Sequence, residues 1–118
     1  MGTKYDILIL EDDPSVALML GHLLGSFHRV RVARTAAAAL ALIGERLPDV
    51  ILSDFDLGHD TAEAFLRDVK SRWPRLRCVL HSGARPEQWQ GLLRDRVIDG
   101  VVPKPASCAE LLIALKAA

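Results

Sequence analysis

The chain has 118 residues, half of them hydrophobic, and its 15 basic and 15 acidic side chains give a formal net charge of zero. This length and hydrophobicity are those of one domain with its own core, which excludes a disordered segment, and the zero net charge argues against a broad nucleic-acid-binding face. No apolar run approaches the ~20 residues of a membrane span and no signal-peptide pattern is present, so we expect a cytoplasmic protein that binds neither nucleic acid nor membrane.

Short apolar runs alternate with segments of helical periodicity along the whole chain. The apolar runs predict five strands, at residues 5–10, 30–33, 50–53, 78–81 and 100–102. Each run is followed by a segment whose apolar residues recur every three or four positions, which predicts five helices. Cys78 opens the fourth strand and is predicted to be a buried free thiol.

The first helix is predicted to begin after Asp13, which serves as its N-cap, with Pro14 as its first residue. Its predicted buried stripe consists of Val16, Met19, Leu20, Leu23, Leu24 and Phe27. The second helix is predicted to start at Thr35 and to end before Pro48, with Leu47 on its buried face.

The three remaining helices are predicted from capping signals and prolines. The third is predicted to begin near Asp60, where Glu63 three residues later suggests a capping box. The fourth is predicted to begin near Pro86, and Leu93 is placed on its buried face. The fifth opens with a second capping box, Ser107 and Glu110.

This alternation predicts an α/β protein in which five βα units build one parallel sheet with helices on both faces. The expected arrangement is a doubly wound, flavodoxin-like three-layer sandwich with strand order 2-1-3-4-5 and one domain over residues 1–118. In that order the first and third strands are neighbours, so the residues after each of them should meet at one edge of the sheet.

Charged side chains follow three of the predicted strands. Glu11, Asp12 and Asp13 come after the first strand, Asp54 after the third and Lys104 after the fifth. Two like charges 4 Å apart repel by about 4 kcal/mol at an effective dielectric constant of about 20, so carboxylates this close require protonation or a bound cation. Asp13 is more simply explained as the helix N-cap. The pattern predicts a Mg²⁺ site built around a phosphorylatable aspartate.

These residues resemble the receiver domain of response regulators in bacterial two-component signalling, and the resemblance covers residues 5–116. It places the family's acidic pair on Glu11 and Asp12, its phosphoacceptor on Asp54, its hydroxyl residue on Ser82 and its lysine on Lys104. The resemblance also implies a cis peptide bond between Lys104 and Pro105.

The resemblance implies that Asp54 accepts a phosphoryl group from a histidine kinase or a histidine phosphotransfer protein and becomes an aspartyl phosphate. Asp12, Asp54 and the backbone carbonyl of Asp56 would bind Mg²⁺, and Glu11 would hold a metal-bound water. Ser82 and Lys104 would contact phosphoryl oxygens. Such a domain is a phosphoprotein that signals by conformational change, not an enzyme with turnover, and a downstream protein would bind the face of the fourth helix, fifth strand and fifth helix.

Two positions depart from the family pattern. Gly58 stands where the family usually has proline, so the loop 55–61 is expected to be less constrained. Val101 stands where the family usually has an aromatic residue, so a ring cannot act as a switch there. Pro103 removes a backbone donor from the fifth strand, which fits a strand at the edge of the sheet.

Three alternatives compete with the receiver. Asp54-Phe55-Asp56 resembles the nucleophile motif of haloacid-dehalogenase-like phosphatases, although Gly58 stands where that motif expects Thr or Val. A flavodoxin-like FMN site would need a phosphate-binding loop after the first strand, where Glu11, Asp12 and Asp13 would repel phosphate. A degenerate receiver that only binds proteins is the alternative least needed to explain the sequence, because all the groups required for phosphorylation are present.

Overall fold

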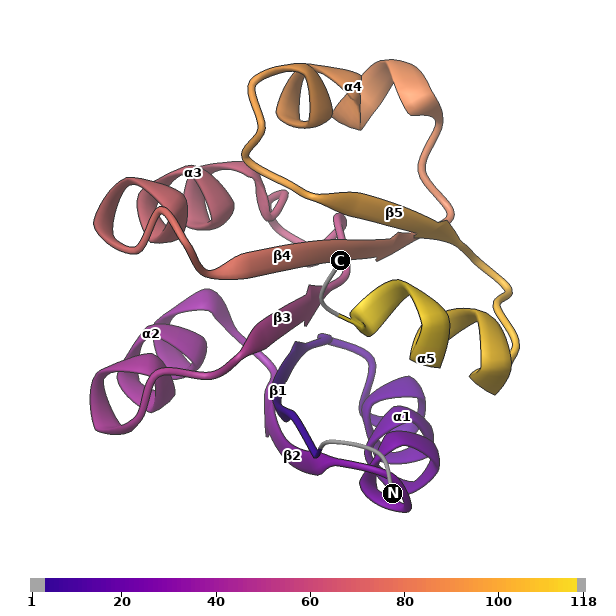
Figure 1. Cartoon of the computed structure of the whole chain (residues 1–118). Coiled ribbons are helices and arrows are strands. Elements are labelled where there is room, and N and C mark those ends of the chain that lie inside the picture. The colour runs from indigo at the N-terminus through magenta and orange to yellow at the C-terminus, as the bar shows by residue number, and fades with distance from the viewer. Residues whose placement is uncertain (1–3, 117–118) are drawn as a thin grey trace.

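Five parallel strands form one sheet in the order β2-β1-β3-β4-β5 in the computed structural model, which describes residues 4–116 (Figure 1). The strands are β1 (Asp6–Leu10), β2 (Arg29–Ala33), β3 (Val50–Ser53), β4 (Arg77–Ser82) and β5 (Gly100–Pro103). The helices are α1 (Pro14–Gly25), α2 (Ala36–Glu45), α3 (Glu63–Arg72), α4 (Pro86–Arg94) and α5 (Cys108–Leu115). The predicted α/β fold and strand order are therefore confirmed.

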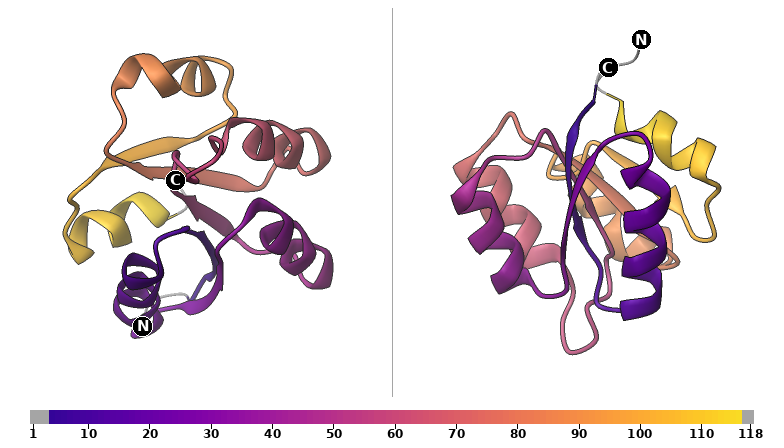
Figure 2. Two further views of the ribbon diagram at one scale, coloured as in Figure 1. Left: turned by 180° about the vertical axis from the view of Figure 1, so that it is seen from behind. Right: turned by 90° about the horizontal axis from the view of Figure 1, so that it is seen from below.

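The helices cover both faces of the sheet, as the view along it shows (Figure 2). Leu20 and Leu24 of α1 pack with Leu111 and Leu115 of α5 in one hydrophobic cluster. Residues from α2, α3 and α4 pack in a second cluster on the opposite face. Within residues 4–116, no helix combines the length and the hydrophobicity that crossing a membrane would require.

Side chains of the central strands alternate between these two clusters. In β1, Ile7 and Ile9 belong to the α1/α5 cluster, whereas Leu8 and Leu10 belong to the opposite one. Because both faces of β1 and β3 are buried, these strands are continuous apolar runs rather than alternating ones. Each face of the sheet is thus covered by an apolar layer.

The strand register brings the polar residues that follow the strands to the same edge. Leu10 of β1 lies opposite Ser53 of β3, so Glu11 and Asp54 follow at the same level. Ser82 of β4 lies opposite Pro103 of β5, so Lys104 follows at the same edge. Pro103 is tolerated because β5 has a neighbour on one side only.

The third helix begins later than predicted. Its first residue is Glu63, and its N-cap is Ala62, which makes no side-chain capping bond. Residues 56–61 form a loop instead, closed by a bridge between Asp56 and Thr61 and by a hydrogen bond of 2.9 Å from the Leu57 N–H to the Asp60 carbonyl. The predicted Asp60–Glu63 capping box is wrong because these loop contacts hold Asp60 outside the helix.

Several helix faces also differ from the prediction. On α1 the buried residues are Ala17, Leu20 and Leu24, whereas Met19 and Leu23, predicted to be buried, are exposed. Phe27, placed on the same stripe by the prediction, lies beyond the end of α1 and is exposed as well. Leu47 and Leu93, predicted to be buried, are exposed as well. The N-caps of α1 and α5 are as predicted: the Asp13 side chain accepts from the backbone N–H groups of Ser15 and Val16, and Ser107 and Glu110 form the capping box.

Candidate functional site

A cleft of about 770 Å³ opens at the carboxyl ends of β1, β3, β4 and β5. All six residues predicted to form the site line it: Glu11, Asp12, Asp54, Asp56, Ser82 and Lys104. They come from four separate strands or the loops that follow them, and the parallel register alone brings them together. This position matches the general rule for ligand sites in open α/β sheets.

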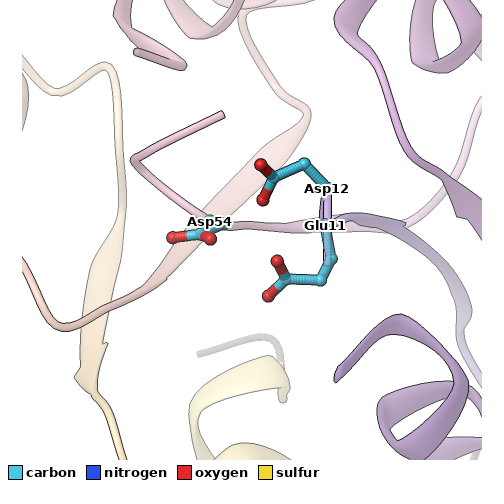
Figure 3. Close-up of side chains that lie close together, drawn as sticks. All are labelled: Glu11, Asp12 and Asp54. Atoms are coloured by element: carbon cyan, nitrogen blue, oxygen red, sulfur yellow. The ribbon is translucent and has the colours of Figure 1, made fainter. Parts of the chain in front are cut away.

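Three carboxylates converge on one point of this cleft (Figure 3). One oxygen each of Glu11, Asp12 and Asp54 lie within 4.8 Å of one another. Such a set consists of hard oxygen ligands only, which suits Mg²⁺ and disfavours metals that prefer nitrogen or sulfur. The donor set therefore fits the metal that the sequence predicts.

Lys104 is the cation of this cluster. Its Nζ lies 3.1 Å from Oε1 of Glu11 and 3.2 Å from Oδ2 of Asp54. Burial opposes its charged form, but the hydrogen bond to Glu11 and the charges of Asp54 and Glu11 outweigh burial, so the pKa of Lys104 is raised. The ammonium is therefore charged at neutral pH and offsets part of the repulsion among the carboxylates.

Glu11 is the most buried member, with only 2% of its surface exposed. Burial raises the pKa of its carboxyl group, although the hydrogen bonds from the Asp13 N–H and from Lys104 act in the other direction. Both of its oxygens are used, because Oε1 accepts from Lys104 and Oε2 accepts from the Asp13 N–H at 3.2 Å. Glu11 is thus held in place before any ligand binds.

The loop after β3 shapes one wall of the cleft. The Asp56 N–H donates to Oδ1 of Asp54 at 3.4 Å, and the Asp56 carboxylate accepts from the Gly58 N–H at 3.0 Å. Gly58 has φ of +85°, a conformation that proline cannot adopt and that other residues adopt at a cost. The loop is therefore held by its own hydrogen bonds, and glycine is what allows this geometry.

Ser82 and the segment after β5 form the opposite wall. Ser82 is buried at the end of β4, and its Oγ accepts from the Ala84 N–H at 2.9 Å. Its backbone carbonyl accepts from the Lys104 N–H at 2.9 Å, which ties the two strand ends together. The Lys104–Pro105 peptide bond is cis, as the resemblance implied. Ser82 can still donate its hydroxyl hydrogen into the cleft.

Two residues near the site received no role from sequence reasoning. Arg34, in the loop after β2, donates to the backbone carbonyl of Asp12 at 3.4 Å. His81 is only 4% exposed, directly before Ser82, and neither ring nitrogen has a hydrogen-bond partner within residues 4–116. The only signal in the sequence was the position of His81, in an apolar strand and next to Ser82.

Comparison with known proteins agrees with this geometry. The family model described as the response regulator receiver domain matches residues 7–116. The chain is 32% identical over 116 residues to the transcriptional activator protein ExaE of Pseudomonas putida, covering 93% of this chain and 53% of that protein. It is also 32% identical over 108 residues to a protein-glutamate methylesterase/protein-glutamine glutaminase of Rhodopseudomonas palustris, covering 86% of this chain and 29% of that one.

Solved structures show the same fold. NtrX from Brucella abortus in complex with ADP superposes with a TM-score of 0.85 at 27% identity, over 94% of this chain and 25% of that one. The chemotaxis response regulator CheY4 of Vibrio cholerae superposes with a TM-score of 0.83 at 26% identity, over 96% of this chain and 97% of that one. The chain thus spans about half of one curated relative and under a third of the other, and it belongs to the response regulator receiver domain family.

Proposed function

We propose that Asp54 is the phosphoacceptor of this receiver domain and that its phosphorylation depends on Mg²⁺. The observation that carries the proposal is the position of Asp54 between the acidic cluster and Lys104, in the same cleft as Ser82. A carboxylate oxygen of Asp54 would attack the phosphorus atom of a phosphohistidine. The new O–P bond forms as the P–N bond breaks, and the leaving imidazole takes the electron pair.

The chain supplies distinct groups for this transfer. Asp12, Asp54 and the backbone carbonyl of Asp56 would hold Mg²⁺, and Glu11 would hold one of its waters. The bound cation would neutralise part of the negative charge on the phosphoryl oxygens. The hydroxyl of Ser82 would donate to one phosphoryl oxygen, and the ammonium of Lys104, now hydrogen-bonded to Asp54, would contact another.

Phosphorylation by a small donor tests the acceptor. Incubation with acetyl phosphate and Mg²⁺ should add one phosphoryl group, labile at high pH, to the wild-type protein and none to Asp54→Asn. Asp56→Asn is the matched control, because that exposed side chain serves the loop and only its backbone is assigned to the site. Full labelling of Asp54→Asn, measured by intact-mass spectrometry, would show that the acceptor is another residue.

We also propose that the domain is not an enzyme with turnover and catalyses only its own phosphorylation and dephosphorylation. The family match over residues 7–116 supports this over the phosphatase alternative, which no specific observation favours. Sustained release of phosphate from small phosphate esters, with more than one equivalent per protein, would contradict the proposal. Loss of that release in Asp54→Asn would then identify the phosphatase.

The proposed partners are a histidine kinase or a histidine phosphotransfer protein as donor, and a downstream protein on the face formed by α4, β5 and α5. A panel of purified phosphohistidine proteins, tested for rapid transfer to the wild-type domain and not to Asp54→Asn, would identify the donor.

The single domain over residues 1–118 and the cytoplasmic location are parts of the same proposal, although residues 1–3 and 117–118 lie outside the described residues. Cell fractionation tests the location.

A further inference from the structure

Two adjoining grooves lie at the edge of the sheet opposite the cleft described above, where the strands begin. Val50 and Arg77, the first residues of β3 and β4, line the first groove, which has a volume of about 420 Å³. The second groove has a volume of about 480 Å³, and Asp49, Pro74 and Arg75 line both grooves. Each volume falls within the roughly 300–1,000 Å³ that is usual for small-ligand sites.

The first groove, here called the charged groove, carries an excess of positive charge. Its charged lining residues are two acids and three bases: Asp49, Asp99, Lys70, Arg75 and Arg77. Nζ of Lys70 lies 2.8 Å from Oδ2 of Asp99, so these two charges neutralise each other. Arg75 and Arg77 form no ion pair among residues 4–116, and Asp49 can offset only one of them. One positive charge of the charged groove is therefore unbalanced.

Both arginines also have unused N–H donors. The Arg77 guanidinium donates from Nη2 to the Ala114 carbonyl at 3.1 Å, and its Nη1 has no hydrogen bond within the part of the chain that the structure describes. Arg75 is exposed, and its side chain makes no hydrogen bond to any described residue. The Asp49 carboxylate accepts from the Asp6 N–H at 2.7 Å instead. A guanidinium fork matches the two oxygens of a carboxylate, so this pair of arginines is suited to bind one.

The second groove, here called the apolar groove, exposes hydrophobic surface to water. Its apolar lining residues come from the loop after α2 and from the segment between α3 and β4: Leu47, Pro48, Trp73, Pro74 and Leu76. Leu47 is 50% exposed and Trp73 is partly exposed. Arg72 lies over the Trp73 ring, 5.9 Å from its centroid, and pairs with Asp68 at 3.1 Å, so it adds no unbalanced charge. An apolar group that covered this surface would be stabilised by the hydrophobic effect.

We propose that the two grooves form one binding site for a small monocarboxylate with an aromatic or aliphatic body. Arg75 and Arg77 bind the carboxylate in the charged groove, and Leu47 and Trp73 contact the body in the apolar groove. A single carboxylate matches the one unbalanced positive charge, whereas a dianion would exceed it beside Asp49. No residue assigned to phosphorylation lines either groove, so this inference is independent of the proposed function.

A pair of isosteric probes tests the role of the charge. 1-Naphthylacetate and 1-naphthylacetamide share a shape, and only the first is an anion. Titrated into the whole chain at pH 7, the carboxylate should bind with a Kd of about 1 mM and the amide about fivefold more weakly. Binding is followed in ¹H–¹⁵N NMR spectra, where the shift changes should centre on the Trp73 indole and on residues 47–49 and 73–77.

Single substitutions at exposed positions separate the two contributions. Arg75→Gln removes one guanidinium, so the carboxylate should lose about fivefold in affinity while the amide keeps its own. Leu47→Ser should weaken the binding of both probes equally, by about threefold. Arg29→Gln is the matched control: Arg29 is exposed at the start of β2, outside both grooves, and its loss should change neither Kd.

Each of four results would overturn the proposal. Equal Kd values of the two probes for the wild-type chain would show adsorption to an apolar surface only. An unchanged Kd of the carboxylate in Arg75→Gln, or shift changes centred on the exposed Leu18 and Val32, would place the binding elsewhere. The fourth is no binding of either probe at about ten times the expected Kd. Asp54→Asn should bind both probes like the wild-type chain, whatever the outcome of the phosphorylation assay.

Discussion

Glu11 and Asp12 are adjacent in the chain but use their carboxylate oxygens differently. Both oxygens of Glu11 accept hydrogen bonds, from Lys104 and from the Asp13 N–H. Asp12 is only partly buried, and no side-chain hydrogen bond of its carboxylate is found among the described residues. Asp12 can therefore coordinate a cation directly without giving up a partner, whereas Glu11 is better suited to hold a metal-bound water.

We predict from this difference that Asp12→Asn weakens Mg²⁺ binding more than Glu11→Gln does, because a direct ligand is lost in one variant and a water-holding group in the other. Isothermal titration calorimetry with MgCl₂ measures both. Asp13→Asn, which keeps the N-cap of α1, is the control and should bind Mg²⁺ like the wild-type protein. Equal losses in Asp12→Asn and Glu11→Gln would contradict the division of roles.

The two cysteines differ in burial. Cys78 is fully buried in β4, and burial raises the pKa of its thiol to about 11. Cys108, at the start of α5, is partly exposed. Because the thiolate is the reactive form, we predict that iodoacetamide at pH 8 modifies the native protein at Cys108 only and the denatured protein at both residues. Peptide mapping distinguishes the sites.

The raised pKa of Cys78 also has a consequence for stability. The pKa of the thiol is near its ordinary value of 9.0 in the unfolded chain and about 11 in the folded chain, so the stabilising effect is complete below pH 9 and is lost between pH 9 and 11. Unfolding by urea should therefore show a steeper loss of stability over that window in the wild-type protein than in Cys78→Ala. Parallel pH profiles would be inconsistent with a buried thiol.

At the scale of the elements, the loop after β3 depends on one glycine. Gly58 has φ of +85°, and a Cβ there would lie 3.3 Å from Oδ2 of Asp12. The family's usual proline would in addition remove the N–H that donates to Asp56. The departure from the family pattern at position 58 thus comes with a different loop conformation.

We predict that Gly58→Ala lowers the free energy of unfolding by about 1–2 kcal/mol, because an L-residue pays that cost in the left-handed region. Gly44→Ala is the matched control. Gly44 lies in α2 with open space around its Cβ position, so that variant should gain about 0.5–1 kcal/mol. Urea denaturation measures both. A neutral Gly58→Ala would show that the loop can adopt another conformation at no cost.

At the scale of the whole molecule, a chain of contacts leads from the cleft to α4. The Ser82 hydroxyl accepts from the Ala84 N–H at 2.9 Å, and the Ala84 carbonyl accepts from the indole N–H of Trp89 at 3.3 Å. Val101 of β5 is partly buried and packs against the same core as Trp89. It has no ring that could exchange between an exposed and a buried position.

We predict that a beryllofluoride phosphoryl mimic with Mg²⁺ changes hydrogen exchange across residues 82–90 more than across residues 99–104. When Ser82 turns toward the mimic, Ala84 and Trp89 are linked to it, whereas Val101 is not. Asp54→Asn with the same additives is the control and should show no change. A response at 99–104 without one at 82–90 would mean that Val101 takes part in switching by another route.

Local patterns in the sequence determined much of this protein. The alternation of apolar runs and helical periodicity predicted the five βα units, and the strand order was the one expected for a doubly wound, flavodoxin-like arrangement of such units. Polar residues directly after strands identified Glu11, Asp12, Asp54 and Lys104 as neighbours, because parallel strands end at one edge. Such signals involve residues that are close in the sequence, so they can be recognised without knowledge of the packing.

Only the tertiary structure decided which side chains those patterns bury and pair. Periodicity does not fix the width of a helix's buried face, so Met19 and Leu23 are exposed although they lie on the predicted stripe. The start of α3 depends on loop hydrogen bonds around Asp56 that no local sequence motif predicts. The burial of His81, with neither ring nitrogen paired among residues 4–116, depends on how the layers pack around β4, which is a long-range property of the whole sheet.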